Sequence, residues 1–530
     1  MPEIPKKFIK RAAENVISFG DTDVFPFPFE NILIRRDRDG FISVIEELAE
    51  NFETSMVSNP PQFESTLVPA GYQGYRWATQ ICPFWNAYLL AAVLRHGDEI
   101  EAARVPTALH HVHSYRVDGN LKNPAIFQSD YNWRSFMLRS HDAAQRSNYV
   151  VVTDVSEFYR RIYHHRIENS LEQVSASNLP DKIVELLKQF SGGSSYGLPI
   201  GGPAARIMSE VVINQIDHLL MAKGIEFCRF SDDFHIFTST EEEAYKAIQQ
   251  LSELLILNQG LTLQKSKTRI LPASEFLSTF PNHLLPGAQP QTDRERLFSL
   301  SLNFDPYAPT ADEDYEELKA SLGNIDFLAL LDEELSKSQI HNPTVSKLIK
   351  GLKVTTGRIR TSAIKTILDS IGILYPVFTQ LLIVLNSIKE ELRDAEFVLI
   401  CEQLLHLSES GSYIMSLDIH RCFAVRILQS FPGYRVDALF DNWYQHGSPI
   451  LRRDIIAAYI ARNAWLQLSD LKHRIAGASP WERRAFIAGS YVLGDEGKHW
   501  RNAQTFNSFE TFVRDGASKL SDTKELGKLV

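Results

Sequence analysis

Two kinds of hydrophobic pattern divide the chain. Between about residues 148 and 272, apolar runs rich in β-branched and aromatic residues, at 149–155 and 226–238, are followed by segments with apolar residues at helical spacing. Beyond about residue 310 nearly every segment has the helical period, and strand patterns almost vanish. The apolar stripes include Ile364, Ile367, Leu368 and Ile371, and further on Ile456, Tyr459 and Ile460. The pattern predicts an α+β region followed by an all-α region.

A break in this periodicity marks a domain junction. Residues 284–296 contain two prolines, a glycine and several polar side chains, which favour an irregular connection. We place the junction near 285–310 and predict two domains, at 1–290 and 291–530. Helical segments of roughly 12–20 residues with short breaks are typical of stacked helix pairs, although no unit recurs at a fixed period. The second domain is therefore predicted to be an irregular, HEAT-like helical repeat. Before residue 90 only one helix is clear, at 41–52.

Composition adds few constraints. With 44% hydrophobic and 23% charged residues, the chain is typical of folded soluble proteins. The net charge of −10 argues against a surface that binds nucleic acid throughout, but it permits a local basic channel. Four cysteines without a C-x-x-C spacing indicate neither a zinc ribbon nor a disulfide framework. The longest apolar run, at 87–94, is far too short to span a membrane, so we expect a soluble cytoplasmic protein.

Two adjacent aspartates interrupt an apolar stretch. Asp232 and Asp233 lie within C-R-F-S-D-D-F-H-I-F, at 228–237, where the aromatic neighbours favour a half-buried strand and Asp is disfavoured. A tight turn between two strands would accommodate the pair through local hydrogen bonds. A chemical role is the alternative, and it requires further carboxylates nearby.

A third carboxylate follows the other predicted strand. Asp154 ends the apolar run Y-V-V-V-T-D, and pairing of the two strands would bring it to Asp232 and Asp233. Divalent cations would relieve the repulsion within such a cluster. Two Mg²⁺ ions about 3.5–4 Å apart activate an attacking hydroxyl and stabilise a leaving oxygen in phosphoryl transfer. The sequence therefore predicts a two-metal site for Mg²⁺, with Mn²⁺ as a substitute.

A flexible loop and a basic turn accompany these acids. The loop surrounds Pro199 with the glycines Gly197, Gly201 and Gly202, so its backbone can come close to a ligand, and an amphipathic helix follows it. The basic turn lies within G-L-T-L-Q-K-S-K-T-R-I-L and contains Lys265, Lys267 and Arg269.

In this order the motifs D-V-x-x-F-Y, G-L-P-x-G-x-x-A-x-x-x-x-x-E, F-S-D-D and G-L-T-L-x-x-x-K-T resemble the palm motifs of reverse transcriptases. With an all-helical second half and no recognisable thumb, the chain looks most like the abortive-infection reverse transcriptases of bacterial antiphage defence. That group includes the AbiK and AbiA types and a branch carried by P2-like prophages. The resemblance implies a fingers and palm domain joined to a helical domain that shapes a channel for single-stranded DNA product, in a cytoplasmic bacterial homo-oligomer, a trimer or a hexamer.

The resemblance also implies the metal ligands. Asp154 and Asp232 would be the principal ligands and Asp233 the third acid, with the carbonyl of Val155 as an additional ligand.

Nucleotide contacts follow from the same resemblance. Tyr159, five residues after Asp154, would be a steric gate that excludes a ribose 2′-hydroxyl, so dNTPs are the expected substrates. Lys267 would lie near the triphosphate, with Lys265 as the alternative, and Arg134 is a further candidate. Core packing is the competing interpretation for Tyr159, a helix-entry loop for the glycines and a solvated turn for the lysines.

The nucleotide loop departs from the family pattern. The usual loop is L-P-Q-G, whose glutamine lies by the incoming nucleotide, whereas here Ile200 stands between Pro199 and Gly201. An aliphatic side chain cannot make those hydrogen bonds. This departure puts templated copying in doubt and agrees with the abortive-infection enzymes, which make DNA without a template and can prime on a protein hydroxyl. The alternatives are an RNA-templated reverse transcriptase of retron or group II intron type, and a catalytically idle oligomeric phage sensor.

Two basic segments have open roles. His110, His111 and His113 have no acid or cysteine at ligand spacing, so we predict a structural or phosphate-contacting role rather than a metal site. Past the first acid, Arg161 and His165 lie four residues apart on a predicted helix. That face could contact a nucleic-acid backbone, and a solvated face is an equal alternative.

Overall fold

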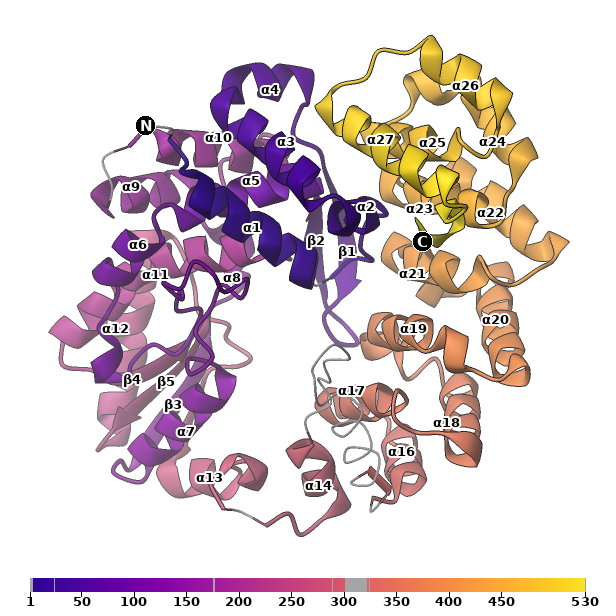
Figure 1. The fold of residues 1–530 in the computed structure, drawn as a ribbon. Coiled ribbons are helices and arrows are strands. Elements are labelled where there is room, and N and C mark those ends of the chain that lie inside the picture. The colour runs from indigo at the N-terminus through magenta and orange to yellow at the C-terminus, as the bar shows by residue number, and fades with distance from the viewer. Residues whose placement is uncertain are drawn as a thin grey trace.

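The computed structural model describes residues 3–22, 24–174, 177–287, 289–300, 322–323 and 325–529. Figure 1 shows a sheet-containing part and an arc of helices that meet at both ends. Part of the expected junction, at residues 288 and 301–310, lies outside the described residues. Among the residues that are described, no helix combines the length and the apolar character needed to cross a membrane.

The N-terminal region contains more structure than the sequence pattern predicted. Five helices precede residue 95: α1 (Lys6–Phe19), α2 (Glu30–Arg36), α3 (Arg38–Glu50), α4 (Phe52–Ser58) and α5 (Pro83–Leu94). An antiparallel hairpin of β1 (Phe63–Pro69) and β2 (Tyr75–Ile81) lies between α4 and α5. Every residue of α5 is buried, and α5 packs against α1, α3, α10 and α11. A helix buried on all sides has no polar face, which explains why periodicity did not reveal it.

A four-stranded antiparallel sheet forms the centre of the next region. Its order is β4 (Glu226–Phe230), β5 (Asp233–Thr238), β3 (Tyr149–Asp154) and β6 (Arg269–Pro272). Val150 and Phe237 lie in a cluster with residues of α7 and α13, whereas Val151 and Ile236 belong to the main core, where α12 packs on β3 and β5. Successive strand residues therefore point to opposite faces, and both faces are covered by helices.

The helices of this region surround the sheet. They are α6 (Gly97–Ala103), α7 (Trp133–Ala144), α8 (Phe158–Arg161), α9 (His164–Val174), α10 (Leu179–Phe190), α11 (Pro203–Ala222), α12 (Glu241–Gln259), α13 (Ala273–Ser278) and α14 (Asp293–Ser299). The stretch 226–238 forms two strands joined by a turn at Ser231 and Asp232. The turn and the carboxylate cluster, posed as alternatives from the sequence, thus coexist.

The predicted all-α second half is confirmed within the described residues. Its helices are α16 (Phe327–Leu335), α17 (Asn342–Gly351), α18 (Gly357–Asp369), α19 (Phe378–Ser387), α20 (Asp394–Glu409), α21 (Asp418–Leu428), α22 (Tyr434–His446), α23 (Pro449–Ala461), α24 (Trp465–Lys472), α25 (Pro480–Gly489), α26 (Asp495–Asn502) and α27 (Ser508–Asp522). The odd-numbered helices from α17 to α27 pack each on the next and form one layer, while α16, α18, α20 and α22 form a second layer. The predicted apolar stripes are buried.

Contacts at three places close the structure on itself. The last α-helix, α27, packs on α2 and α3. The buried guanidinium of Arg484, on α25, donates to Glu30 of α2 at 2.7 Å. The hairpin contacts the short helix Tyr375–Val377, and the hydroxyl of Tyr375 donates to that of Tyr75 at 2.8 Å. At the third place α14 packs on α17. The hairpin and the helical half therefore meet beside the sheet-containing part (Figure 1), and a cavity lies between the hairpin and α17 to α19.

Candidate active site

Two of the predicted acids face each other across neighbouring strands. Asp154, the last residue of β3, pairs directly with Asp233, the first residue of β5. The backbone N–H of Val155 donates to the carbonyl of Asp232 at 3.0 Å, so the turn is tied to the end of β3. The predicted meeting of Asp154 with Asp232 and Asp233 is therefore what the strand register produces.

A buried arginine holds the turn that carries Asp232. The guanidinium of Arg229, on β4, donates to the carbonyl of Ser231 at 2.8 Å, and Ser231 has a left-handed backbone with φ of +56°. The same guanidinium binds Glu210 and Asp217 of α11, at 2.9 and 2.6 Å. All three charged side chains are essentially inaccessible to solvent. Arg229 thus fixes the acidic turn relative to the helix that follows the nucleotide loop.

The charge balance of the acids is unfavourable without a cation. Burial and the negative charges of Asp232 and Asp154 raise the pKa of Asp233 to about 7. The pKa of Asp232 is also raised, by burial and then by Asp154. Like charges held together favour the protonated forms. The site therefore carries more negative charge than its surroundings compensate.

Lys267 partly compensates this charge. Its ammonium group binds the carboxylate of Asp154, a contact that the sequence did not predict, since the motif placed Lys267 near the triphosphate. Across the described residues, no three His, Cys, Asp or Glu side chains are gathered closely enough to hold a metal ion. The donor set nevertheless suits Mg²⁺, because it consists of carboxylate oxygens on two paired strands with excess negative charge. Coordination by Asp154 would require Lys267 to move away.

The predicted gate and nucleotide loop lie together. The backbone N–H of Leu198 donates to the carbonyl of Tyr159 at 2.8 Å, which docks the loop on the segment that follows Asp154. Gly201, with φ of +137°, has a conformation that L side chains rarely adopt. Tyr159 and Ile200 line the same cavity, with Pro199 buried behind them. The fold therefore brings Tyr159 and Ile200 to one cavity.

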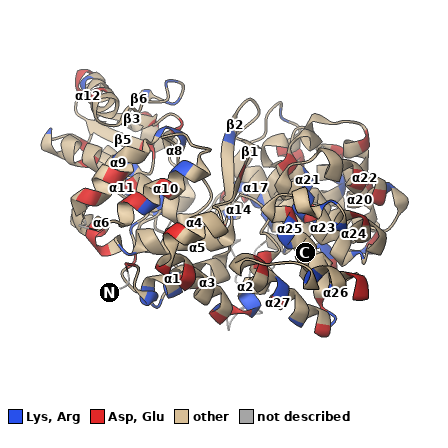
Figure 2. Cartoon of the chain, turned by 90° about the horizontal axis from the view of Figure 1, so that it is seen from above, with Lys and Arg blue, Asp and Glu red and all other residues tan. Residues whose placement is uncertain are grey.

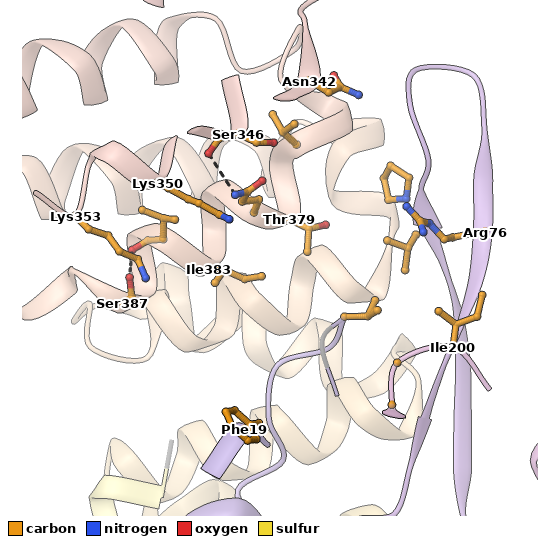
Figure 3. A pocket seen from close by; sticks show the side chains of 18 of the residues that line it. Phe19, Arg76, Ile200, Asn342, Ser346, Lys350, Lys353, Thr379, Ile383 and Ser387 are labelled. Atoms are coloured by element: carbon orange, nitrogen blue, oxygen red, sulfur yellow. Dashed lines mark hydrogen bonds between the residues drawn. The ribbon is translucent and has the colours of Figure 1, made fainter. Parts of the chain in front are cut away.

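This cavity is large and basic. It has a volume of about 2180 Å³ and lies between the loop, the hairpin and α17 to α19. Figure 3 shows Arg76 and Ile200 on one side and Lys350, Lys353 and Thr379 on the other. Its charged lining residues are Arg35, Arg38, Arg76, Arg206, Lys350, Lys353 and Glu391. Six cations against one anion contrast with the net charge of −10 for the whole chain.

Other sequence predictions have mixed outcomes. Arg134 donates to the carbonyl of Leu284 at 3.3 Å, in a contact outside the acid cluster, and Lys265 is exposed. His111 donates from Nδ1 to the carbonyl of Phe227 and stacks on its ring, while His113 donates from Nε2 to the carbonyl of His110 and hydrogen-bonds the hydroxyl of Ser135. These contacts agree with the structural role predicted for the histidines.

Several site residues were not singled out from the sequence. Arg229, Glu210 and Arg206 lie within or beside the recognised motifs, and a charged residue inside a strand pattern was the available signal for Arg229. Arg76, Lys350 and Lys353 come from distant segments, and only the fold brings them to one cavity.

Comparisons with known proteins find one matching family profile. Residues 105–279 match the family profile of reverse transcriptase (RNA-dependent DNA polymerase). No curated protein matches the chain at a significant level. Among solved structures, apo telomerase from Candida tropicalis is similar at 11% identity and a TM-score of 0.31, covering 75% of this chain and 73% of that one. Telomerase from Candida albicans in complex with a telomeric RNA fragment has 12% identity, a TM-score of 0.30, and coverages of 73% and 64%. The chain contains a reverse transcriptase domain of the nucleotidyltransferase type at residues 105–279.

Proposed function

We propose that this protein is a Mg²⁺-dependent DNA polymerase that joins deoxynucleotides without a template. The observation that carries the proposal is the direct pairing of Asp154 with Asp233 beside a basic cavity lined by Tyr159 and Ile200. The reverse transcriptase domain supports a polymerase, and the cavity offers a path for a polyanion.

Chemistry would occur at the acidic turn. Asp154, Asp232 and Asp233 would hold the divalent ions, with the carbonyl of Val155 as a further ligand. When bound, these ions would activate the attacking hydroxyl and stabilise the leaving oxygen. A 3′-hydroxyl attacks the α-phosphorus in line, and the bond to pyrophosphate breaks as the new oxygen–phosphorus bond forms. Lys267, released from Asp154, would bind the triphosphate.

The basic cavity would hold the product strand. Lys353 lies three residues after Lys350. Burial, together with the positive charge of Lys350, lowers the pKa of Lys353. A phosphate between them would relieve that repulsion. Arg76 on the hairpin would contact the strand from the opposite side (Figure 3).

Ile200 supports synthesis without a template. Its side chain lines the cavity beside Tyr159 and offers no hydrogen bond to a template base. The ring of Tyr159 would limit the sugar to deoxyribose. From the resemblance we also propose a role in phage defence, priming on a hydroxyl of the protein itself, and a homo-oligomeric state.

Synthesis without added nucleic acid tests the proposal. Purified protein is incubated with Mg²⁺ and labelled deoxynucleotides, with neither primer nor template, beside Asp232→Ala and the control Asp142→Ala, an exposed acid on α7. We expect long labelled DNA from the parent and the control and none from Asp232→Ala. A shift of the product after protease treatment would indicate covalent attachment.

Two other outcomes would contradict the proposal. Product that forms only after a primed RNA template is added would favour a templated reverse transcriptase. No product under either condition would favour an idle sensor.

A further inference from the structure

Three aromatic side chains and an arginine form an exposed strip outside the cavity. Trp77 of β2, Tyr163 and Tyr196 have 40%, 40% and 46% of their surfaces exposed. The guanidinium of Arg160, on α8, lies 5.7 Å from the ring centre of Trp77. The rings of Tyr163 and Tyr196 lie 6.0 Å apart. We call these four residues the aromatic strip.

Backbone contacts hold the strip in place. Tyr163 and Tyr196 form an isolated antiparallel bridge, and the N–H of Gly197 donates to the carbonyl of Ile162 at 2.8 Å. The strip is therefore built on the segment that docks the nucleotide loop. In Figure 2, α8 lies between the sheet and the β1–β2 hairpin. Backbone pairing between Tyr163 and Tyr196, and between β1 and β2 at Trp77, holds the chain segments that carry the three rings of the strip.

The strip faces away from the cavity. Successive residues of a strand point to opposite faces, and Arg76 lines the cavity, so Trp77 points to the other face of the hairpin. Arg160, Tyr163 and Tyr196 are also not among the residues that line the cavity, so the strip lies outside the wall that carries Tyr159 and Ile200.

Charge around the strip is mainly positive. Arg160, Arg161 and Arg166 lie within seven residues of the chain, and the acid beside them, Glu157, is bound to Arg161 at 3.3 Å. Exposed rings interleaved with cations are the combination that binds single-stranded nucleic acid, because bases stack on the rings while cations contact the phosphates.

We propose that the aromatic strip binds single-stranded nucleic acid outside the catalytic cavity. Bases would stack on Trp77, Tyr163 and Tyr196, and Arg160 would contact the backbone or stack beside Trp77. The inference rests on the proposed function in one respect, because the strip would serve to guide a strand at the polymerase. Binding of the strand by the strip does not depend on catalysis.

Binding is tested in the full-length Asp232→Ala protein, which removes synthesis. Labelled oligo(dT) and oligo(rU) of about 12 nucleotides, within the usual site size, are titrated by fluorescence anisotropy. The strip variant combines Trp77→Leu, Tyr163→Leu and Tyr196→Leu, which keeps apolar volume. The control combines Trp465→Leu and Tyr434→Leu, two exposed aromatics of the helical half. Thermal melting checks that both variants are folded.

We expect the strip variant to bind about 5- to 100-fold more weakly, the loss that corresponds to at least one stacked base, while the control binds like the parent. Arg160→Gln alone should reduce the slope of log affinity against log salt by about 0.7 per lost phosphate contact. Oligonucleotides with 5-iodouracil should crosslink to peptides containing Trp77, Tyr163 or Tyr196. If the strip variant does not fold, the crosslinks and Arg160→Gln still decide the question.

Equal binding by parent and strip variant, or crosslinks only within the cavity, would overturn the inference. A preference for oligo(dT) would identify the bound strand as DNA, and a preference for oligo(rU) would identify it as RNA. Either result supports the inference. Binding by the strip in a protein whose parent makes no DNA would refute the proposed polymerase and leave the inference standing.

Discussion

The ammonium group of Lys267 binds the carboxylate of Asp154, one of the two acids that face each other at the ends of β3 and β5. The lysine therefore stands where a divalent cation would compete for the same oxygen atoms. The exposed side chain of Lys267 is free to rotate away, since 62% of its surface contacts solvent.

This competition predicts that replacing Lys267 strengthens the binding of Mg²⁺ and weakens the binding of a deoxynucleoside triphosphate. In Lys267→Gln the competing cation is gone, so Mg²⁺ should bind up to about 5-fold more tightly, the range for an exposed ion pair. Binding of a deoxynucleoside triphosphate should weaken by about 10-fold, because a charge-assisted contact is lost. Calorimetry measures both, and Lys265→Gln is the matched control. Equal effects of the two variants would contradict the role given to Lys267.

Removing one acid should stabilise the protein that lacks metal. Asp233→Asn relieves repulsion with Asp232 and Asp154, so the free energy of unfolding should rise by about 1–2 kcal/mol at neutral pH. Mg²⁺ should raise the melting temperature of the parent more than that of the variant, because the variant keeps Asp154 and Asp232 but loses the third acid. Differential scanning fluorimetry with and without Mg²⁺ provides the measurement, with Asp142→Asn as control. An equal rise in the parent and the variant would show that Asp233 does not contribute to the Mg²⁺ site.

Tyr159 should discriminate between sugars. Tyr159→Ala would open space at the wall shared with Ile200, and incorporation of ribonucleotides relative to deoxynucleotides should rise by about 10- to 100-fold. Tyr159→Phe keeps the ring and should retain the parent's preference. Single-turnover incorporation of each nucleotide gives the ratio, and an unchanged ratio in Tyr159→Ala would assign Tyr159 to packing alone.

Arg229 should be essential to the fold of the acidic turn. Arg229→Met leaves Asp217 with uncompensated buried charge and Glu210 with Arg104 as its remaining cation, so unfolding should become easier by about 3–5 kcal/mol. Adding Asp217→Asn should restore part of this loss, because one of the two charges is removed. Urea denaturation of the single and double variants measures the coupling. Additive losses would show that Arg229 and Asp217 do not act as a pair.

Acid should destabilise the helical half through His420. Burial lowers the pKa of His420 to about 4, and its ring bonds the carbonyl of Ile414 at 2.6 Å and Thr379 at 3.1 Å. The unfolded state binds a proton near pH 6.5 and the folded state only near pH 4, so stability falls as pH drops through this window, by about 3 kcal/mol in total. Melting curves of parent and His420→Gln between pH 7 and 4 test this expectation. The variant should lose less stability on acidification than the parent.

Local pattern and long-range packing differ in how far the sequence predicts them. Asp154 and Asp233 could be placed together because each lies at the end of a clear strand pattern and antiparallel pairing aligns those ends. The partners of Arg229 could not be predicted, since a buried arginine network depends on how β4 packs against α11. The cavity between Arg76 and Lys350 requires the hairpin and the helical arc to meet, which no local periodicity encodes.

The hairpin contacts the helical half, and α14 contacts α17. Through these contacts the protein forms a closed circuit around the cavity. A chain molecule grown inside a closed circuit of protein cannot be released sideways, as a ligand leaves an open groove. It must leave end first, along its own length, unless the contacts that close the circuit break. Dissociation of a long product should therefore slow with its length, and blocking its far end with a bulky group should trap it on the protein.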